Sequence, residues 1–502
     1  MVSSAWCYPE SPFMDNEARR LPFVFTTFLN KKDQRKLSIY KELEHAPFMT
    51  RSREQMMDRL GMSPFLVGKT VEELAADFVQ SGLQKEVALS WDGETIELHT
   101  NGRFTSELLF SYYAEKSIKF SLFTAIFCER LHSINSFALD HFLSHTTVYN
   151  EFKELKKALQ ALAIDINKEF KLVGDEWRIR EVALLFFSMM KRFDPLRTLQ
   201  SAKEINHFAQ LFFGSAFSDN YSSSLALRLK IYLGIVTVRI RNQHYLAKLS
   251  NTSLANQVAS QKLPTIQTWL RSRKTMEEDF IKQESLGLLN YLIVEGWLEE
   301  ERFMQDSCPE ILRFNQLFMD FLTPRLKENS RQYEVRLKDQ LMKIHYELVH
   351  FPLYVKYKYT MTEVTYFFEA YPEYVEWCRT FLEKNKKEQV LWEAKEFLFY
   401  RYLLLLVTTI PMNEIIEPLY VCVDFSFGEA YNHFIKESIS RIVNLNILFQ
   451  RSPTLQTDLI LSDIVLAENS SIDQVCWLTP PRPTDWAILT EKILDLRKMK
   501  YE

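Results

Sequence analysis

The first 185 residues of the chain repeat themselves at an offset of 81 positions. Under this offset Met57 falls on Ala138, Val67 on Val148, Leu74 on Leu155 and Gly93 on Gly174. A repeat constrains architecture more strongly than any short motif, because both copies must fold into the same supersecondary unit. The chain therefore begins with two related domains in tandem.

Each copy has the pattern of a helix-turn-helix. A short helix, a turn and a longer amphipathic helix are predicted in that order, with the short helices at 53–60 and 135–143 and the turns at 61–63 and 144–146. The two helices must cross closely, so one apolar residue of each has to meet at the elbow. The pairs Met57/Val67 and Ala138/Val148 are both ten residues apart, as that contact requires.

A hairpin is expected after the longer helix of each copy. In the first copy, 87–91 and 95–99 flank an Asp92-Gly93 turn, the strongest short hairpin signal. In the second copy, 164–166 and 170–173 form a comparable ribbon that ends at Gly174. We therefore predict two winged helix-turn-helix domains.

The longer helix of the second copy separates an apolar seam from a polar face. The seam comprises Val148, Phe152, Leu155, Leu159 and Leu162. The opposite face carries Thr146, Asn150, Lys153 and Lys157, residue types that contact base edges and phosphates in a DNA groove. Thr147, Tyr149 and, in the ribbon, Lys171 are further candidates for contact with the DNA backbone. The alternative is that any amphipathic helix has a solvated polar face.

The first copy is a weaker candidate for reading bases. Its outward positions are Phe65, Lys69, Glu72 and Ala76, and the carboxylate of Glu72 would repel phosphate. Residues 31–69 nevertheless hold nine basic and five acidic residues, a local charge of +4. Lys31, Lys32 and Lys69 are therefore predicted to contact the DNA backbone. The alternative is that this copy only packs against its neighbour.

Composition narrows the remaining function classes. The 61 basic and 65 acidic residues give a net charge of −4, so the charge alone does not indicate nucleic acid. The 11 glycines, roughly 2% against a usual 7%, favour helices. They form no G-x-G, which excludes a dinucleotide fingerprint. The six cysteines lack metal-binding spacing and indicate a reducing compartment.

The remaining chain is expected to add helical bundles and a small α/β domain. The longest apolar stretch, 402–411, is too short to span a bilayer, and residues 1–20 lack the apolar core of a secretory signal. The fold class is thus mainly α and multidomain. We predict a leader at 1–22, winged helices at 23–103 and 104–185, helical domains at 186–300 and 301–410, and an α/β domain at 411–502.

Two segments carry a resemblance to a known family. Lys153-Glu-Leu-Lys-Lys-Ala-Leu-Gln160 and Phe170-Lys-Leu-Val-Gly-Asp-Glu-Trp-Arg-Ile-Arg180 resemble the second recognition helix, wing and exit helix of Mga/AtxA-type transcriptional regulators of Gram-positive bacteria. That family of virulence regulators joins tandem winged helices to two phosphotransferase-system (PTS) regulation domains, or PRDs, and a domain like the PTS IIB component. The resemblance implies PRD-like bundles and a IIB-like carboxyl-terminal domain here.

The resemblance also directs attention to regulatory histidines. In the family, PTS phosphocarriers modify histidines of the PRDs, but here Tyr232 and Gln340 occupy two such places. His207 and His345 are the surviving candidates, with ordinary surface or core histidines as the alternative. Cys422 lies inside a predicted strand rather than in the loop that follows, so phosphoryl transfer by the IIB-like domain is not expected.

These features predict a cytoplasmic regulator that binds promoter DNA, forms a homodimer or higher oligomer, and responds to a PTS phosphocarrier. No catalytic group, cofactor, metal or membrane span is expected. Two alternatives remain open, a non-catalytic protein-interaction scaffold and a PRD-type RNA-binding antiterminator. Residues 1–13 carry no pattern, so Met1 and Met14 both remain candidate start positions.

Overall fold

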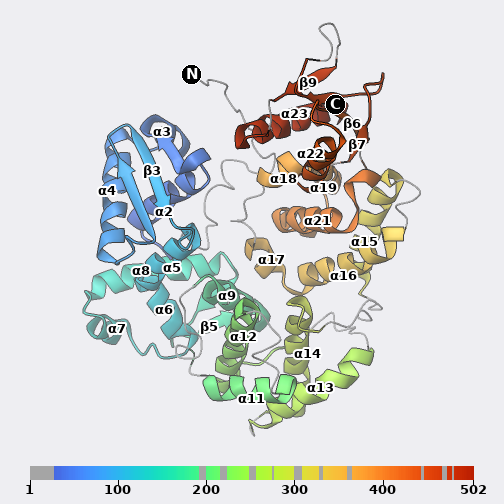
Figure 1. Cartoon of the computed structure of the whole chain (residues 1–502). Coiled ribbons are helices and arrows are strands. Elements are labelled where there is room, and N and C mark those ends of the chain that lie inside the picture. The colour runs from blue at the N-terminus through green and yellow to red at the C-terminus, as the bar shows by residue number, and fades with distance from the viewer. Residues whose placement is uncertain are drawn as a thin grey trace. The chain divides into compact units, whose positions relative to one another are not determined.

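The computed structural model describes twelve stretches and one single residue of the chain, and these fall into two compact units (Figure 1). The first unit comprises Met1–Cys308 and Glu347–Met361, and the second comprises Pro309–Tyr346 and Thr362–Glu502. The described residues are 28–190, 199, 201–214, 223–247, 256–273, 276–298, 308–326, 332–358, 365–415, 417–442, 446–465, 472–477 and 480–501. The predicted leader at 1–22 lies outside them.

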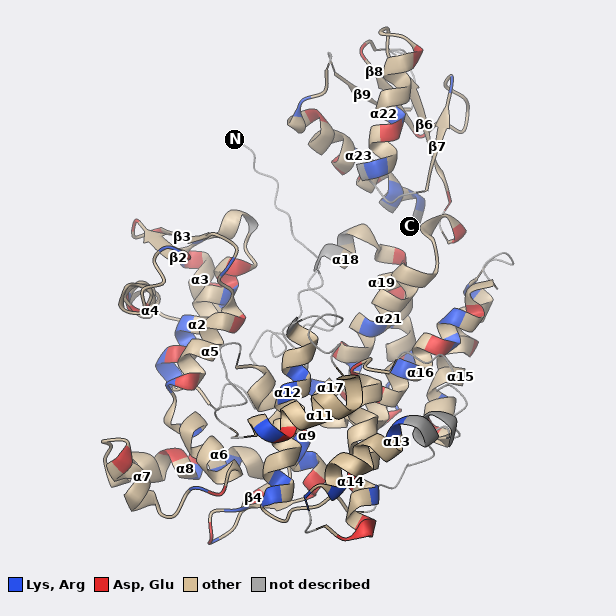
Figure 2. Ribbon diagram, turned by 60° about the horizontal axis from the view of Figure 1, so that its bottom comes forward, with Lys and Arg blue, Asp and Glu red and all other residues tan. Residues whose placement is uncertain are grey.

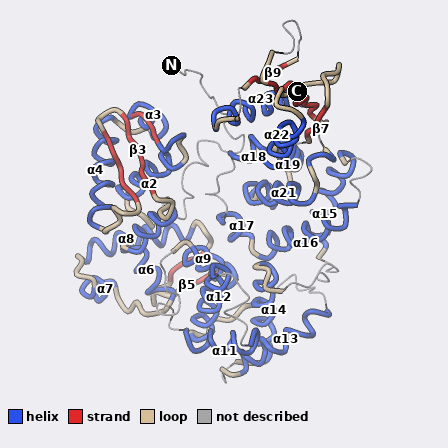
Figure 3. Tube along the Cα trace, viewed as in Figure 1, coloured by secondary structure: helices blue, strands red, loops and turns tan. Residues whose placement is uncertain are grey.

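Helices dominate both units, and the described strands form three small sheets (Figure 3). The prediction of a mainly α, multidomain chain with a small carboxyl-terminal sheet is therefore confirmed. The exact boundaries of the six predicted domains remain predictions.

The first winged helix follows the sequence pattern closely. Its elements are α2 (Lys31–Glu44), η1 (Pro47–Met49), β1 (Thr50–Ser52), α3 (Arg53–Leu60), α4 (Pro64–Gln80), β2 (Val87–Trp91) and β3 (Thr95–Thr100). The predicted hairpin of β2 and β3 forms, and Asp92 Oδ1 accepts hydrogen bonds from the amides of Glu94 and Thr95 at its turn. Strand β1, which the sequence did not predict, extends the sheet to the order β1-β3-β2.

The second winged helix has the same plan. Its elements are α5 (Ser106–Glu115), α6 (Ile118–Phe127), α7 (Ile134–Asp140), α8 (His145–Gln160), β4 (Ile164–Ile166) and β5 (Leu172–Gly174). The turn predicted at 144–146 is wrong by two residues. Ser144 Oγ accepts a hydrogen bond from the amide of Thr147, which caps the helix and lets it begin at His145.

The same backbone hydrogen bond closes the elbow of both copies. The amide of Met62 donates to the carbonyl of Met57, and the amide of Leu143 donates to the carbonyl of Ala138, at the offset of 81 that relates the copies. This bond belongs to the Schellman ending of a helix, which needs a left-handed residue just after the helix. Gly61 supplies it in the first copy with φ 61°.

Within the described residues, five long helices continue the first unit after the second winged helix. They are α9 (Glu176–Ser188), α11 (Ala202–Phe213), α12 (Ser223–Arg241), α13 (Asn256–Arg271) and α14 (Glu278–Val294), and the shorter α17 (Pro352–Lys358) joins them. One continuous apolar core runs from the winged helices into this bundle. Trp177 of α9 donates a hydrogen bond of 2.7 Å to the carbonyl of His350, which fixes α9 near the start of α17.

The second unit combines a helical part with a small α/β part. The helical elements are α15 (Pro309–Leu322), η4 (Thr323–Arg325), α16 (Glu334–His350, up to Tyr346), α18 (Thr365–Ala370), α19 (Pro372–Lys384), α20 (Gln389–Glu393), α21 (Lys395–Thr409) and η6 (Met412–Glu414). The α/β part contains β6 (Leu419–Asp424), α22 (Glu429–Ile442), β7 (Ile447–Gln450), β8 (Leu459–Ser462), β9 (Asp473–Cys476) and α23 (Pro483–Tyr501).

The sheet of this α/β part is parallel throughout, in the order β7-β6-β8-β9. The second strand in sequence therefore lies outside the first, which is the start of the doubly wound 2-1-3-4 order. Its core includes Val421, Leu461, Ile435 and Ile493, so that strands and helices share one apolar layer. A small α/β domain is what the sequence predicted for this part of the chain.

Candidate nucleic-acid interface

Helix α8 presents the two faces that the sequence predicted. Val148, Leu155 and Leu159 are buried against the rest of the second winged helix. Thr146, Asn150, Lys153 and Lys157 are all exposed. The arrangement leaves one amide, one hydroxyl and two ammonium groups accessible along one side of the helix, a set that can donate to base edges and phosphates.

The amino-terminal turn of α8 is held by its own side chains. The hydroxyl of Thr147 lies 2.7 Å from Ser144 Oγ, so Thr147 takes part in the helix cap. Exposed Tyr149 stacks on the ring of His145 with centroids 6.1 Å apart, and Lys153 Nζ lies 5.7 Å from the Tyr149 ring. Tyr149 therefore lies between the imidazole ring of His145 and the ammonium group of Lys153 on the helix surface.

Two carboxylates of α8, which the sequence analysis did not consider, form ion pairs with a buried lysine of α6. Lys119 of α6 lies 3.3 Å from Glu151 and 2.6 Å from Glu154, and its side chain is only 6% exposed. The buried ammonium group neutralises charge that would otherwise repel phosphate beside the exposed face. Lys119 is the one charged residue in the stretch 118–127, and this is the sequence signal, not a periodic one, that could have indicated the pairing.

The wing of the second copy is tied to its helices by lysines. Lys156 donates to the carbonyl of Ile166 at 2.7 Å and pairs with Asp165 at 3.1 Å, which anchors β4 to α8. Lys171, a predicted DNA contact, lies 2.6 Å from Glu129. Glu129 lies 2.5 Å from the ring of His244, beyond the end of α12.

Glu129 is consequently a half-buried acid between the ammonium group of Lys171 and the imidazole ring of His244. Burial raises its pKa, but the hydrogen bonds from Lys171 and His244 outweigh burial and hold the pKa below its usual range. Lys171 is thus engaged within the protein, whereas Lys153 and Lys157 are exposed. Its candidacy as a DNA contact remains a prediction that requires this pair to open.

The first copy contributes its predicted residues from two other helices. Lys31 and Lys32 lie exposed in the first turn of α2, and Lys69 lies exposed on α4. A Cβ added to Gly68 would lie 2.5 Å from the ring of Trp91 in β2, so the glycine lets the wing pack closely on α4. The candidate residues therefore divide between two domains, and Figure 2 shows basic and acidic positions interspersed on both.

The two candidate histidines lie in opposite environments. His207 is exposed on α11. His345 is fully buried in the second unit, where its ring nitrogens bond to Asn315 and, at 2.6 Å, to the hydroxyl of Tyr402. Burial lowers the pKa of His345 to about 3. His345 is thus buried with both ring nitrogens bonded, and its modification by a phosphocarrier remains a prediction that requires this part of the fold to open.

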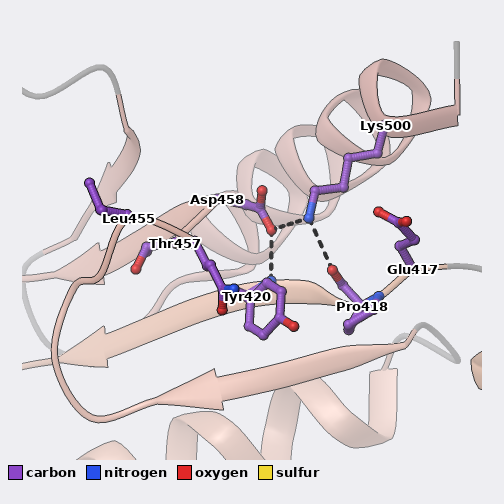
Figure 4. A pocket seen from close by; sticks show the side chains of 8 residues that line it. Glu417, Pro418, Tyr420, Leu455, Thr457, Asp458 and Lys500 are labelled. Atoms are coloured by element: carbon purple, nitrogen blue, oxygen red, sulfur yellow. Dashed lines mark hydrogen bonds and ion pairs between the residues drawn. The ribbon is translucent and has the colours of Figure 1, made fainter.

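A cavity of about 480 Å³ opens in the α/β part (Figure 4). It lies at the amino ends of β6 and β8, whereas ligands of such sheets bind at the carboxyl ends. Lys500 donates to Asp458 at 2.6 Å and to the carbonyl of Pro418, and Asp458 also accepts from the amide of Tyr420. These polar groups satisfy one another. Cys422 is buried within β6, as expected.

The described residues contain no cluster of three or more His, Cys, Asp or Glu side chains that could hold a metal ion. None of their helices combines the length and the apolar character required for a membrane span.

The comparisons with known proteins bear on the second winged helix. No curated protein matches the chain significantly. Residues 102–187 match the Mga helix-turn-helix domain, a range that begins just before α5 and ends within α9. This range contains α7, α8 and the wing. Residues 102–187 are therefore similar to a Mga helix-turn-helix domain, and this match supports the Mga-type regulator family for the chain.

Proposed function

We propose that the protein is a transcriptional regulator that binds promoter DNA through its winged helices. The observation that carries the proposal is the exposed face of α8, with Thr146, Asn150, Lys153 and Lys157 on one side of a capped helix in a Mga-type domain. The amide of Asn150 suits bidentate pairing with adenine, and the lysines suit phosphate or guanine. Thr147 and Tyr149 would contact the backbone, and Lys171 would join them when released from Glu129.

The first winged helix is proposed to hold the DNA backbone. Lys31, Lys32 and Lys69 are exposed and basic, whereas exposed Glu72 on α4 disfavours close approach of that helix to phosphate. Each phosphate contact adds affinity that falls as salt rises. A homodimer would double these contacts, which matters for a chain whose net charge is −4.

The protein is proposed to be cytoplasmic, and its remaining domains are proposed to regulate the winged helices. The helices after α9 are proposed as PRD-like bundles, with exposed His207 as the candidate target of a PTS phosphocarrier. The 2-1-3-4 strand order of the α/β part supports a IIB-like domain. Buried Cys422 supports a role in dimerisation or sensing rather than phosphoryl transfer.

Chromatin immunoprecipitation with sequencing tests the proposal in the native cell. We expect enrichment of a limited set of promoter regions, and loss of that enrichment with Asn150→Ala. A chain that enriches no DNA above a mock control would contradict the proposal. Retention on heparin without preference among duplexes, together with a stable protein partner, would instead favour a protein-interaction scaffold.

A further inference from the structure

The elbow of the second winged helix carries an unusual residue. Phe142 has φ 56°, in the left-handed region, and it is 97% exposed. It lies 81 positions after Gly61, which has nearly the same φ of 61° at the first elbow. The Schellman ending dictates this backbone conformation in both copies, and glycine adopts it most readily.

The second copy therefore places a bulky aromatic residue where a glycine fits the backbone better. Left-handed φ is disfavoured for a side chain of this size, and full exposure of the ring gains no burial. Leu139, three residues earlier on α7, is also 69% exposed and extends the apolar surface. Leu139 and Phe142 are two exposed apolar side chains near the elbow, and we call them the apolar knob.

The position of the knob indicates which group of the DNA it contacts. Phe142 lies two residues before Ser144, the cap of α8, and four before Thr146, the first candidate base contact. The amino-terminal residues of a recognition helix enter the major groove, so the residues that immediately precede the cap, Phe142 among them, lie near the mouth of that groove. The apolar group exposed there in B-DNA is the 5-methyl group of thymine, and phenylalanine is among the side chains that contact it.

We infer that Phe142 contacts a thymine methyl group at the edge of the major groove and so contributes to sequence preference. This inference rests on the proposed function, because it requires α8 to enter that groove. The knob adds an apolar element of specificity to the polar face formed by Asn150 and the lysines.

The test uses the full chain with a duplex that it selects from a random-sequence pool, and the same duplex with thymine replaced by deoxyuridine. The wild type should lose about fourfold in affinity for each contacted methyl group removed. Phe142→Gly should bind the thymine duplex about fourfold more weakly and should lose that part of the thymine preference. Because glycine suits the elbow, this variant should fold at least as stably as the wild type.

Phe48→Gly is the matched control, since Phe48 is also left-handed, at φ 56°, and 96% exposed, but precedes β1 in the first copy. It should bind both duplexes like the wild type. Equal thymine preference in Phe142→Gly and wild type would overturn the inference, as would equal loss on both duplexes. Unchanged DNA affinity with altered sedimentation would overturn it in favour of a contact between copies. If the wild type selects no duplex, the proposed function itself fails.

Discussion

Lys171 of the second wing and Glu129, two residues after the end of α6, form an ion pair of 2.6 Å, and Glu129 also lies 2.5 Å from His244. His244 belongs to the segment after α12, and its carbonyl accepts a hydrogen bond from buried Arg180. Arg180 in turn pairs with Glu284 of α14 at 2.6 Å. A continuous polar network thus joins the wing to the interior of the first helical bundle.

Replacement of Glu129 should strengthen DNA binding. Glu129→Gln removes a negative charge near the wing and releases Lys171, so we expect severalfold tighter binding at low salt and a salt slope steeper by about one phosphate contact. Fluorescence anisotropy across a salt series measures both. In the Glu129→Gln/Lys171→Ala double variant the gain should disappear. A gain that survives in the double variant would show that Lys171 is not the residue released.

Loss of Lys119 should weaken both the fold and DNA binding. Lys119→Met leaves Glu151 and Glu154 unpaired on α8, and we expect a loss of about 1 kcal/mol in the free energy of unfolding and weaker duplex binding. The triple variant Lys119→Met/Glu151→Gln/Glu154→Gln should recover duplex binding, because no carboxylate remains to repel phosphate. Chemical denaturation and anisotropy report the two effects. Wild-type DNA affinity in Lys119→Met would refute this role.

The effect of alanine at position 68 should depend on Trp91. Gly68→Ala would gain about 1 kcal/mol from helix propensity, but its Cβ would lie 2.5 Å from the Trp91 ring, an overpacking that costs about 1–3 kcal/mol. We expect net destabilisation by about 1 kcal/mol in the wild type and stabilisation in a Trp91→Leu background. Denaturant midpoints of the wild type, Gly68→Ala, Trp91→Leu and the double variant give the double-mutant cycle. The same sign in both backgrounds would contradict the packing shown here.

Glu181 should make stability depend on pH. Burial raises its pKa to about 8, although the amides of Leu353 and Tyr354 in α17 donate to it at 3.1 and 3.2 Å and lower the pKa. A raised pKa means that the stabilisation is complete below the usual carboxyl range and is lost as pH rises through about 8. The stability of the wild type relative to Glu181→Gln should therefore fall between pH 5 and pH 9.

Melting temperatures across that range measure this dependence. Glu72→Gln, at an exposed position on α4, should follow the wild type at every pH. Parallel profiles for the wild type and Glu181→Gln would show that Glu181 does not titrate in this way.

The sequence predicted what is periodic or local. The seam of α8, its exposed face and the Asp92-Gly93 hairpin follow from spacing alone, and the structure has them. The start of α8 was not predicted correctly, because periodicity does not show that the hydroxyl of Ser144 caps the helix. The sequence analysis missed β1 and the roles of Lys119 and Glu129 because their partners are distant in sequence and leave no periodic trace. The left-handed backbone of Phe142 was not predicted, because a phenylalanine, unlike the glycine at the equivalent position 61, does not indicate that conformation.

The salt dependence of duplex binding tests the central claim, that the exposed face of α8 binds DNA. The full chain, Lys153→Ala/Lys157→Ala and the control Lys343→Ala/Lys387→Ala, which removes two exposed lysines of the second unit, would be compared on one selected duplex from low to physiological salt. We predict that the α8 variant binds more weakly and that its log–log salt slope is shallower by about two, while the control retains both values. Identical affinity and slope in all three proteins would contradict the account.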